Sequence, residues 1–97
     1  MATVELNQTF EGKTPGNLYD AALKALPKMG FNVWRKFPLG NVLMSKRIEN
    51  GKQIDCSFIA HLESPLTVSI TVKSDGFGEA ELRPWAEKVL AALQESL

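Results

Sequence analysis

The sequence predicts an α+β fold, with a curved five-stranded antiparallel sheet in the order β-α-β-β-β-β-α and two helices packed on one face. Apolar and polar residues alternate over residues 54–62 and again over 66–72, which is typical of half-buried strands. Two other stretches repeat apolar residues at helical spacing. Asn50-Gly51 is a strong signal for a two-residue hairpin turn, so neighbouring strands are expected to pair antiparallel.

The N-terminal part of the chain supplies one strand and one helix. Residues 3–10 alternate in polarity and form the first expected strand. Thr14-Pro15 is a typical helix start, because threonine caps helix N-termini and proline is favoured at the first helical position. The helix is expected to extend to Met29, with Gly30 as a suitable residue just past its end.

The middle of the chain supplies two further strands, at residues 31–37 and 42–48, joined by a turn at 38–41. The second of these alternates less regularly than the first, because Lys46 interrupts its apolar face. The residues expected to face the core are Phe31, Val33, Phe37, Val42, Met44 and Ile48.

The chain then closes with a hairpin and a long helix. Residues 54–62 and 66–72 are expected to pair around a reverse turn at Ser64-Pro65. A flexible connection leads to a helix over residues 79–97. Four successive strands joined by short turns form an antiparallel meander, so the two helices are expected to cover one face of the sheet.

Composition limits the class of protein. Ninety-seven residues fit one domain, and we expect residues 1–97 to form a single α+β domain. Eleven basic residues balance eleven acidic ones, so nucleic acid is not an expected partner, although a local basic patch stays open. A single cysteine, Cys56, permits neither an internal disulfide nor a cysteine-based metal site, and we expect no metal and no cofactor.

The N-terminal residues alternate in polarity and contain no long apolar run. We therefore expect neither a signal peptide nor a membrane anchor, and a cytoplasmic location. A domain trimmed from a secreted precursor would show the same pattern.

The stretch Leu18–Val33 ends a helix with a Leu…Gly-Phe-x-Val phrase, and an Asn-Gly-Lys hairpin follows at residue 50. It resembles small bacterial domains of unknown function, many of them lipoproteins. The element order also resembles the helix-grip architecture, and more closely one half of the TATA-binding-protein fold. The resemblance implies that the concave sheet face binds partners, and it supplies no catalytic residues. The lipoprotein members begin with a lipobox cysteine that this sequence lacks, so no lipid anchor is implied.

Cys56 and His61 are the residues that suggest catalysis. They are five positions apart in one strand, so they point to opposite faces of the sheet. Ser57 and His61 share a face but lie about 13 Å apart along the strand. A nucleophile and its base must be within hydrogen-bond reach. We therefore expect no enzyme, and an enzymatic role would need a second polar group beside His61.

The solvent face of the sheet is the first candidate for function. It is expected to carry Trp34, Lys36, Arg47, Ile59 and His61. Trp34 and Ile59 are large apolar residues on an otherwise polar face, which is typical of an interaction surface. We predict a non-enzymatic binding module that uses this open face, with a second copy of the chain or another protein as its partner.

A second interpretation is a carrier of a small apolar ligand or lipid. Phe77, Trp85 and Val89 could line an apolar cleft under the C-terminal helix, with glycines at 76 and 78 acting as a hinge. A chain of this length leaves little room for a cavity, so Trp85 is equally well read as a core residue.

Overall fold

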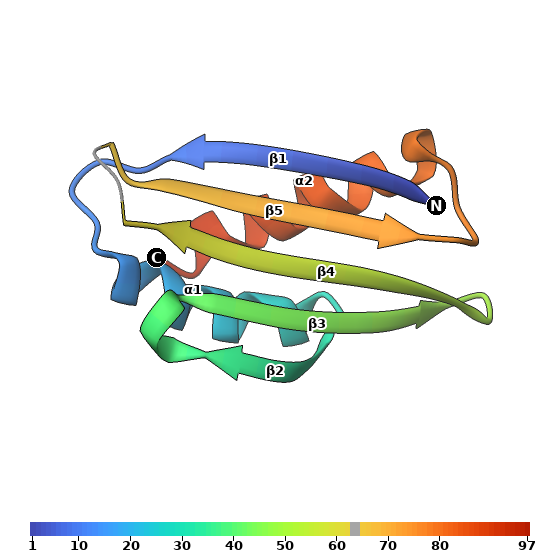
Figure 1. Cartoon of the computed structure of the whole chain (residues 1–97), viewed down its shortest axis with the longest axis horizontal. Coiled ribbons are helices and arrows are strands. Elements are labelled where there is room, and N and C mark those ends of the chain that lie inside the picture. The colour runs from blue at the N-terminus through green and yellow to red at the C-terminus, as the bar shows by residue number, and fades with distance from the viewer. Residues whose placement is uncertain (63–64) are drawn as a thin grey trace.

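The computed structural model describes residues 1–62 and 65–97 and confirms the predicted α+β fold. The five strands form one antiparallel sheet in the order β1-β5-β4-β3-β2. Both helices lie behind one face of the sheet and leave the other face open (Figure 1). The elements are β1 (Ala2–Thr9), α1 (Pro15–Lys28), β2 (Asn32–Phe37), the 3₁₀ turn η1 (Pro38–Gly40), β3 (Val42–Glu49), β4 (Lys52–His61), β5 (Thr67–Ser74) and α2 (Glu79–Glu95).

The residues that the sequence predicted at the two ends of α1, Thr14 and Gly30, lie there in the structure. The Thr14 hydroxyl accepts a hydrogen bond from the Asn17 N–H at 3.1 Å, and the Asn17 side chain accepts one from the Thr14 N–H at 3.3 Å. This reciprocal pair satisfies backbone donors that the helix itself leaves free. Gly30 follows the helix with a φ of 79°, a left-handed conformation that glycine adopts without strain.

The turn between β3 and β4 is the two-residue hairpin expected at Asn50-Gly51. Both residues have positive φ angles, 52° and 76°, as a type I′ turn requires. The turn pairs Glu49 with Lys52 and thereby sets the register of the whole hairpin. The other predicted turn, at Ser64-Pro65, includes residue 64, which lies outside the described residues.

The core lies between the sheet and the two helices. α2 packs against β1 and β5, and α1 packs against β2, β3 and β4. The inner row predicted for the β4–β5 hairpin is confirmed except at its turn end, where Leu62 is 74% exposed and Leu66 is only partly buried. The other apolar residues of the row are buried. These residues are Ile54, Cys56, Phe58, Ala60, Val68, Ile70 and Val72.

The predicted orientation of β3 was wrong. Leu43 is fully buried and pairs with Phe58, and Ser45 pairs with Cys56, so these two residues face the helices. Side chains alternate between the two faces of a strand. The residues expected in the core, Val42, Met44 and Ile48, therefore lie on the open face.

The predicted faces of β2 were correct only before an irregularity in the strand. The pairing with β3 shifts between Val33 and Arg35, which is a β-bulge around Trp34. Beyond the bulge Phe37 pairs with Val42, so Phe37 joins the open face instead of the core. Phe31, which precedes the strand, is buried as expected.

Candidate interaction surface

The open face of the sheet is divided into a polar and an apolar half. Its residues on β1 and β5 are all polar, namely Thr3, Glu5, Asn7, Thr9, Thr67, Ser69, Thr71 and Lys73. Apolar side chains gather instead on β2, β3 and β4. We define the apolar surface as Trp34, Phe37, Val42, Met44 and Ile59.

The register places the members of the apolar surface beside one another. Phe37 pairs with Val42, and Val42 pairs with Ile59, so these three form one row across three strands. Met44 lies two residues further along β3, next to Trp34 in the bulge. Directly opposed side chains on one face are close enough to pack, so the five residues form a continuous surface.

Trp34 is the most prominent member of the apolar surface. Its side chain is 52% exposed although tryptophan is usually more buried. The bulge places Trp34 and Arg35 together opposite Met44. Trp34 also lines a shallow hollow of about 260 Å³, together with Met44, Asp55, Ser57 and Lys73.

Two cations flank the apolar surface. The Arg35 guanidinium lies 5.0 Å from the centre of the Phe37 ring, which is a cation–π contact. Lys46 is exposed and pairs with Asn32 on one side and Asp55 on the other. Arg35 therefore places a positive charge at the edge of the apolar surface nearest β2, whereas Lys46 of β3 lies next to an acidic residue.

The predicted open-face residues are only partly brought together. Trp34 and Ile59 both belong to the apolar surface, and His61 lies on the open face opposite Thr67. Lys36 was placed on the wrong face, because the bulge makes it pair with buried Leu43 on the helix-covered side.

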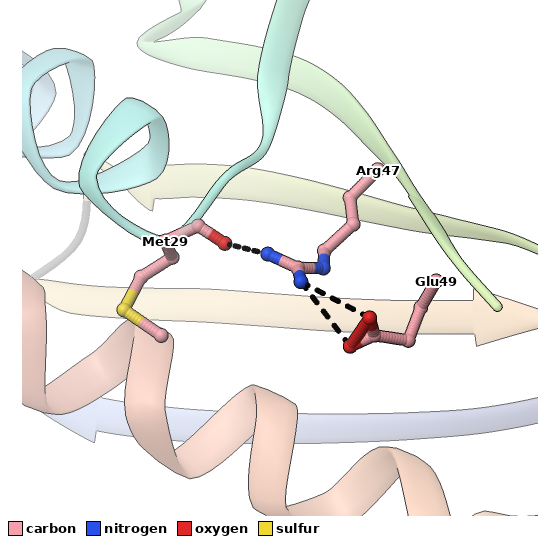
Figure 2. Close-up of polar contacts among 3 residues, drawn as sticks. All are labelled: Met29, Arg47 and Glu49. Atoms are coloured by element: carbon pink, nitrogen blue, oxygen red, sulfur yellow. Dashed lines mark hydrogen bonds and ion pairs between the residues drawn. The ribbon is translucent and has the colours of Figure 1, made fainter.

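Arg47 was also placed on the wrong face. It pairs with the core residue Ile54 and points toward the helices. Its guanidinium lies 4.3 Å from the centre of the Trp85 ring. Nη1 donates to the carbonyl oxygen of Met29 at 2.7 Å, and Nη2 contacts the carboxylate of Glu49 at 3.2 Å (Figure 2).

Arg47 therefore joins three elements instead of offering a charge to a partner. Met29 ends α1, where the helix dipole concentrates negative charge on the last carbonyl groups. Trp85 belongs to α2 and is also packed edge-on against Phe31, with the ring centres 6.1 Å apart. Arginine suits this position because its planar group can stack and donate two hydrogen bonds at once.

The polar half contains a continuous chain of hydrogen bonds that begins at His61. Nε2 of His61 lies 2.8 Å from the hydroxyl oxygen of Ser69. The Ser69 hydroxyl donates to Oδ1 of Asn7, and Nδ2 of Asn7 donates to Glu5 at 3.3 Å. The Thr71 hydroxyl donates to the other carboxylate oxygen of Glu5 at 3.2 Å. The sequence-based search for a polar neighbour of His61 missed Ser69, which lies on the adjacent strand.

The direction of these bonds determines what His61 and Ser69 can do. The Ser69 hydroxyl has one proton and gives it to Asn7, so the contact with His61 requires Nε2–H of His61 as the donor. A general base must instead accept the proton of its nucleophile. His61, Ser69 and Asn7 thus link β4, β5 and β1 across the open face.

Cys56 is the one thiol of the chain and faces the core. Burial raises the pKa of Cys56 to about 12, although a hydrogen bond with Ser45 acts in the opposite direction. The thiolate is the reactive form of cysteine, so Cys56 is inert at neutral pH.

The residues expected to line an apolar cleft are in contact with other side chains. Val89 is buried in the core, and Trp85 is in contact with Phe31, Arg47 and Lys88. The ammonium group of Lys52 lies 5.1 Å from the centre of the Phe77 ring. In the described part of the chain, Phe77, Trp85 and Val89 line none of the three surface hollows found beside Trp34, Lys52 and Lys13.

The sequence matches no protein-family model, and a comparison with curated proteins gives no match. Neither helix of the described chain is long and apolar enough to cross a membrane. Within residues 1–62 and 65–97, no three His, Cys, Asp or Glu side chains are grouped so that they could hold a metal ion.

Proposed function

We propose that this chain is a non-enzymatic interaction module that binds another protein through the apolar surface of its open sheet face. The observation that supports the proposal most strongly is Trp34, a half-exposed tryptophan that lies in a bulge beside Met44, on the same face as Phe37, Val42 and Ile59. Tryptophan dominates the binding energy of many protein interfaces. A cluster of exposed apolar side chains with a polar rim is typical of such interfaces.

The chemistry around Trp34 favours a particular kind of partner. The hollow beside the indole, of about 260 Å³, is open to solvent and smaller than most sites that enclose a drug-sized ligand. It suits one projecting apolar side chain of a partner protein. Arg35 and Lys46 beside the apolar surface favour acidic residues around that side chain.

The likeness to one half of the TATA-binding-protein fold agrees with this use of the open face. The element order is the same, and the helices leave the corresponding face of the sheet free. The balanced net charge of the chain argues for a protein partner over nucleic acid. The direction of the His61–Ser69 hydrogen bond supports a binding role over a catalytic one.

Quantitative co-purification from the cells that make the protein tests the proposal. Trp34→Ala and Phe37→Ala should each lose at least nine-tenths of a specific partner that the wild-type chain retains. Thr71→Ala, a substitution in the polar half of the same face, is the matched control and should retain it. If every partner remains bound to Trp34→Ala, the apolar surface is not the binding site.

A second copy of the chain would be one outcome of the same experiment. In that case sedimentation should show a self-association that Trp34→Ala removes and Thr71→Ala retains. If the wild-type chain binds no protein and shows no self-association that Trp34→Ala removes, the proposed function is wrong.

A further inference from the structure

The outer edge of β1 presents a regular row of backbone donors and acceptors. β1 pairs with β5 over eight consecutive positions without a register shift. The Phe10 N–H donates to the Leu66 carbonyl at 2.9 Å, which continues that pairing. In an antiparallel pair, alternate residues direct both backbone groups to the same neighbour. The even-numbered residues therefore bond to β5, and Thr3, Glu5, Asn7 and Thr9 direct theirs outward.

The two edges of the sheet differ in how they are protected. β2, at the opposite edge, contains a bulge, exposed Lys36 and a proline directly after its last residue. These features hinder pairing with another strand. β1 has neither bulge nor proline, and Glu5 is its one charged residue. Figure 1 shows β1 as an outermost strand, with α2 behind the sheet.

We propose that β1 pairs antiparallel with β1 of a second copy, across a two-fold axis that passes between the two Leu6 residues. In this register Thr3 lies opposite Thr9 of the second copy and Glu5 lies opposite Asn7. All four outward-facing residues of each strand are then hydrogen-bonded. The axis is perpendicular to the sheet, so the helices of both copies lie on the same side.

Neighbouring registers are less favourable. Centring the axis on Glu5 pairs only three outward residues of each strand and places two carboxylates directly opposite, which is destabilising. Centring the axis on Asn7 also pairs only three outward residues of each strand. The Leu6 register pairs the most residues and places each carboxylate opposite an amide, which can donate to it.

The covered side of the edge also favours a second copy. Ala2, Leu6 and Phe10 are apolar residues of this edge that the helices bury only in part. In the proposed register the two Leu6 side chains face each other and remove one another from water. The pairing joins two five-stranded sheets into one of ten strands.

The pairing also has a consequence that rests on the proposed function. Both apolar surfaces would lie on the same side of the ten-stranded sheet, near its two ends. The two β3 strands would be seven strand spacings apart, or about 34 Å. Such a dimer would hold two identical partner segments at once, which increases overall affinity without new contacts.

Disulfide cross-linking tests the register. Residues opposite each other at a non-hydrogen-bonded position have Cα atoms about 4.5 Å apart, within the range of a disulfide. Leu6→Cys should therefore form a cross-linked dimer under mild oxidation. Gln8→Cys is the matched control on the same face, and its symmetry mate would lie about 13 Å away along the strand. The control should cross-link at least tenfold more slowly.

Sedimentation equilibrium tests the pairing itself. As the protein concentration is raised to about 1 mM, which reveals even a weak complex, the apparent mass of the wild type should approach twice the 10.7 kDa mass of one chain. Thr3→Pro removes an N–H that the single copy leaves free, so it should abolish the dimer and preserve the circular dichroism spectrum.

Trp34→Ala should leave this dimer intact, which separates the present inference from the proposed function. A wild-type chain that stays monomeric throughout, or equal cross-linking by Leu6→Cys and Gln8→Cys, would overturn the proposal.

Discussion

Replacing Arg47 by methionine tests the structural role that the fold assigns to this arginine. The substitution keeps much of the side-chain length and removes the guanidinium. It deletes a charge-assisted hydrogen bond to the Met29 carbonyl, worth about 1.5–3 kcal/mol, and a partly desolvated contact with the Trp85 ring, worth about 1–2 kcal/mol. The ion pair with Glu49 is partly exposed and adds about 0–1 kcal/mol.

Two effects oppose this loss. Among residues 1–62 and 65–97, Nε of Arg47 is buried without a hydrogen-bond partner, and its removal recovers about 1–3 kcal/mol. The methionine also packs against Trp85 as an apolar side chain. We therefore expect Arg47→Met to lower the free energy of unfolding by about 2 kcal/mol, which corresponds to roughly 8–16 °C in Tm for a domain of this size.

Urea unfolding followed by circular dichroism measures this change directly. Glu49→Gln is the matched control, because it removes the ion pair but keeps the stacked and hydrogen-bonded guanidinium, and it should cost less than about 1 kcal/mol. If Arg47→Met were as stable as the wild type, burial of the charge would offset all its contacts. The claim that Arg47 holds α1, β3 and α2 together would then be wrong.

Three further predictions follow from other parts of the fold. Urea unfolding should show that Gly30→Ala destabilises the protein more than Gly12→Ala, because both sites have positive φ but only a Cβ at residue 30 would collide with Arg47. The difference between the two variants should be smaller when Arg47→Met is also present. The pKa of Cys56 is raised from 9.0 to about 12 on folding, so the thiol ionises first in the unfolded chain as the pH rises. The contribution of Cys56 to stability should therefore be complete below about pH 9 and fall by about 1.4 kcal/mol per pH unit up to about pH 12. Cys56→Ala should lack this decline. Thr14→Ala should remove the reciprocal cap of α1 and lower the free energy of unfolding by about 1 kcal/mol, whereas an unchanged value in the urea titration would contradict the role of the cap.

The sequence predicted the order of the elements and the antiparallel pairing of the last four strands, because most of these elements have a local signal. It did not predict that β1 pairs with β5, a contact between distant parts of the chain. Alternation identified the β4–β5 hairpin, Thr14-Pro15 identified the start of α1, and Asn50-Gly51 identified the turn between β3 and β4. These signals depend on neighbouring residues alone. They required no knowledge of distant contacts.

The face of β3 was mistaken although the sequence contained enough information to find it. A two-residue turn at Asn50-Gly51 pairs residue 49 with residue 52, and therefore Arg47 with Ile54. Ile54 was already expected in the core, so Arg47 had to share that face. The prediction followed the apolar character of Val42, Met44 and Ile48 instead of the register that the turn sets.

Other features of the candidate site depend on information that the sequence does not hold. The bulge around Trp34 adds one residue to β2, and no local motif in the sequence predicts the position of that extra residue. It reverses the faces of Lys36 and Phe37. The contact between His61 and Ser69 joins diagonal neighbours, because His61 pairs with Thr67 and Ser69 pairs with Ile59, so it depends on side-chain orientation as well as on strand pairing.

Site-specific photo-cross-linking in the cells that make the protein tests the central claim most directly. A photoreactive amino acid replacing Met44 would lie within the apolar surface beside Trp34, and the same amino acid replacing Thr71 would lie in the polar half of the same face. Binding through the apolar surface predicts a discrete cross-linked protein at residue 44, absent at residue 71 and lost when Trp34→Ala is added. Equal cross-linking at both positions, or none at residue 44, would contradict the claim.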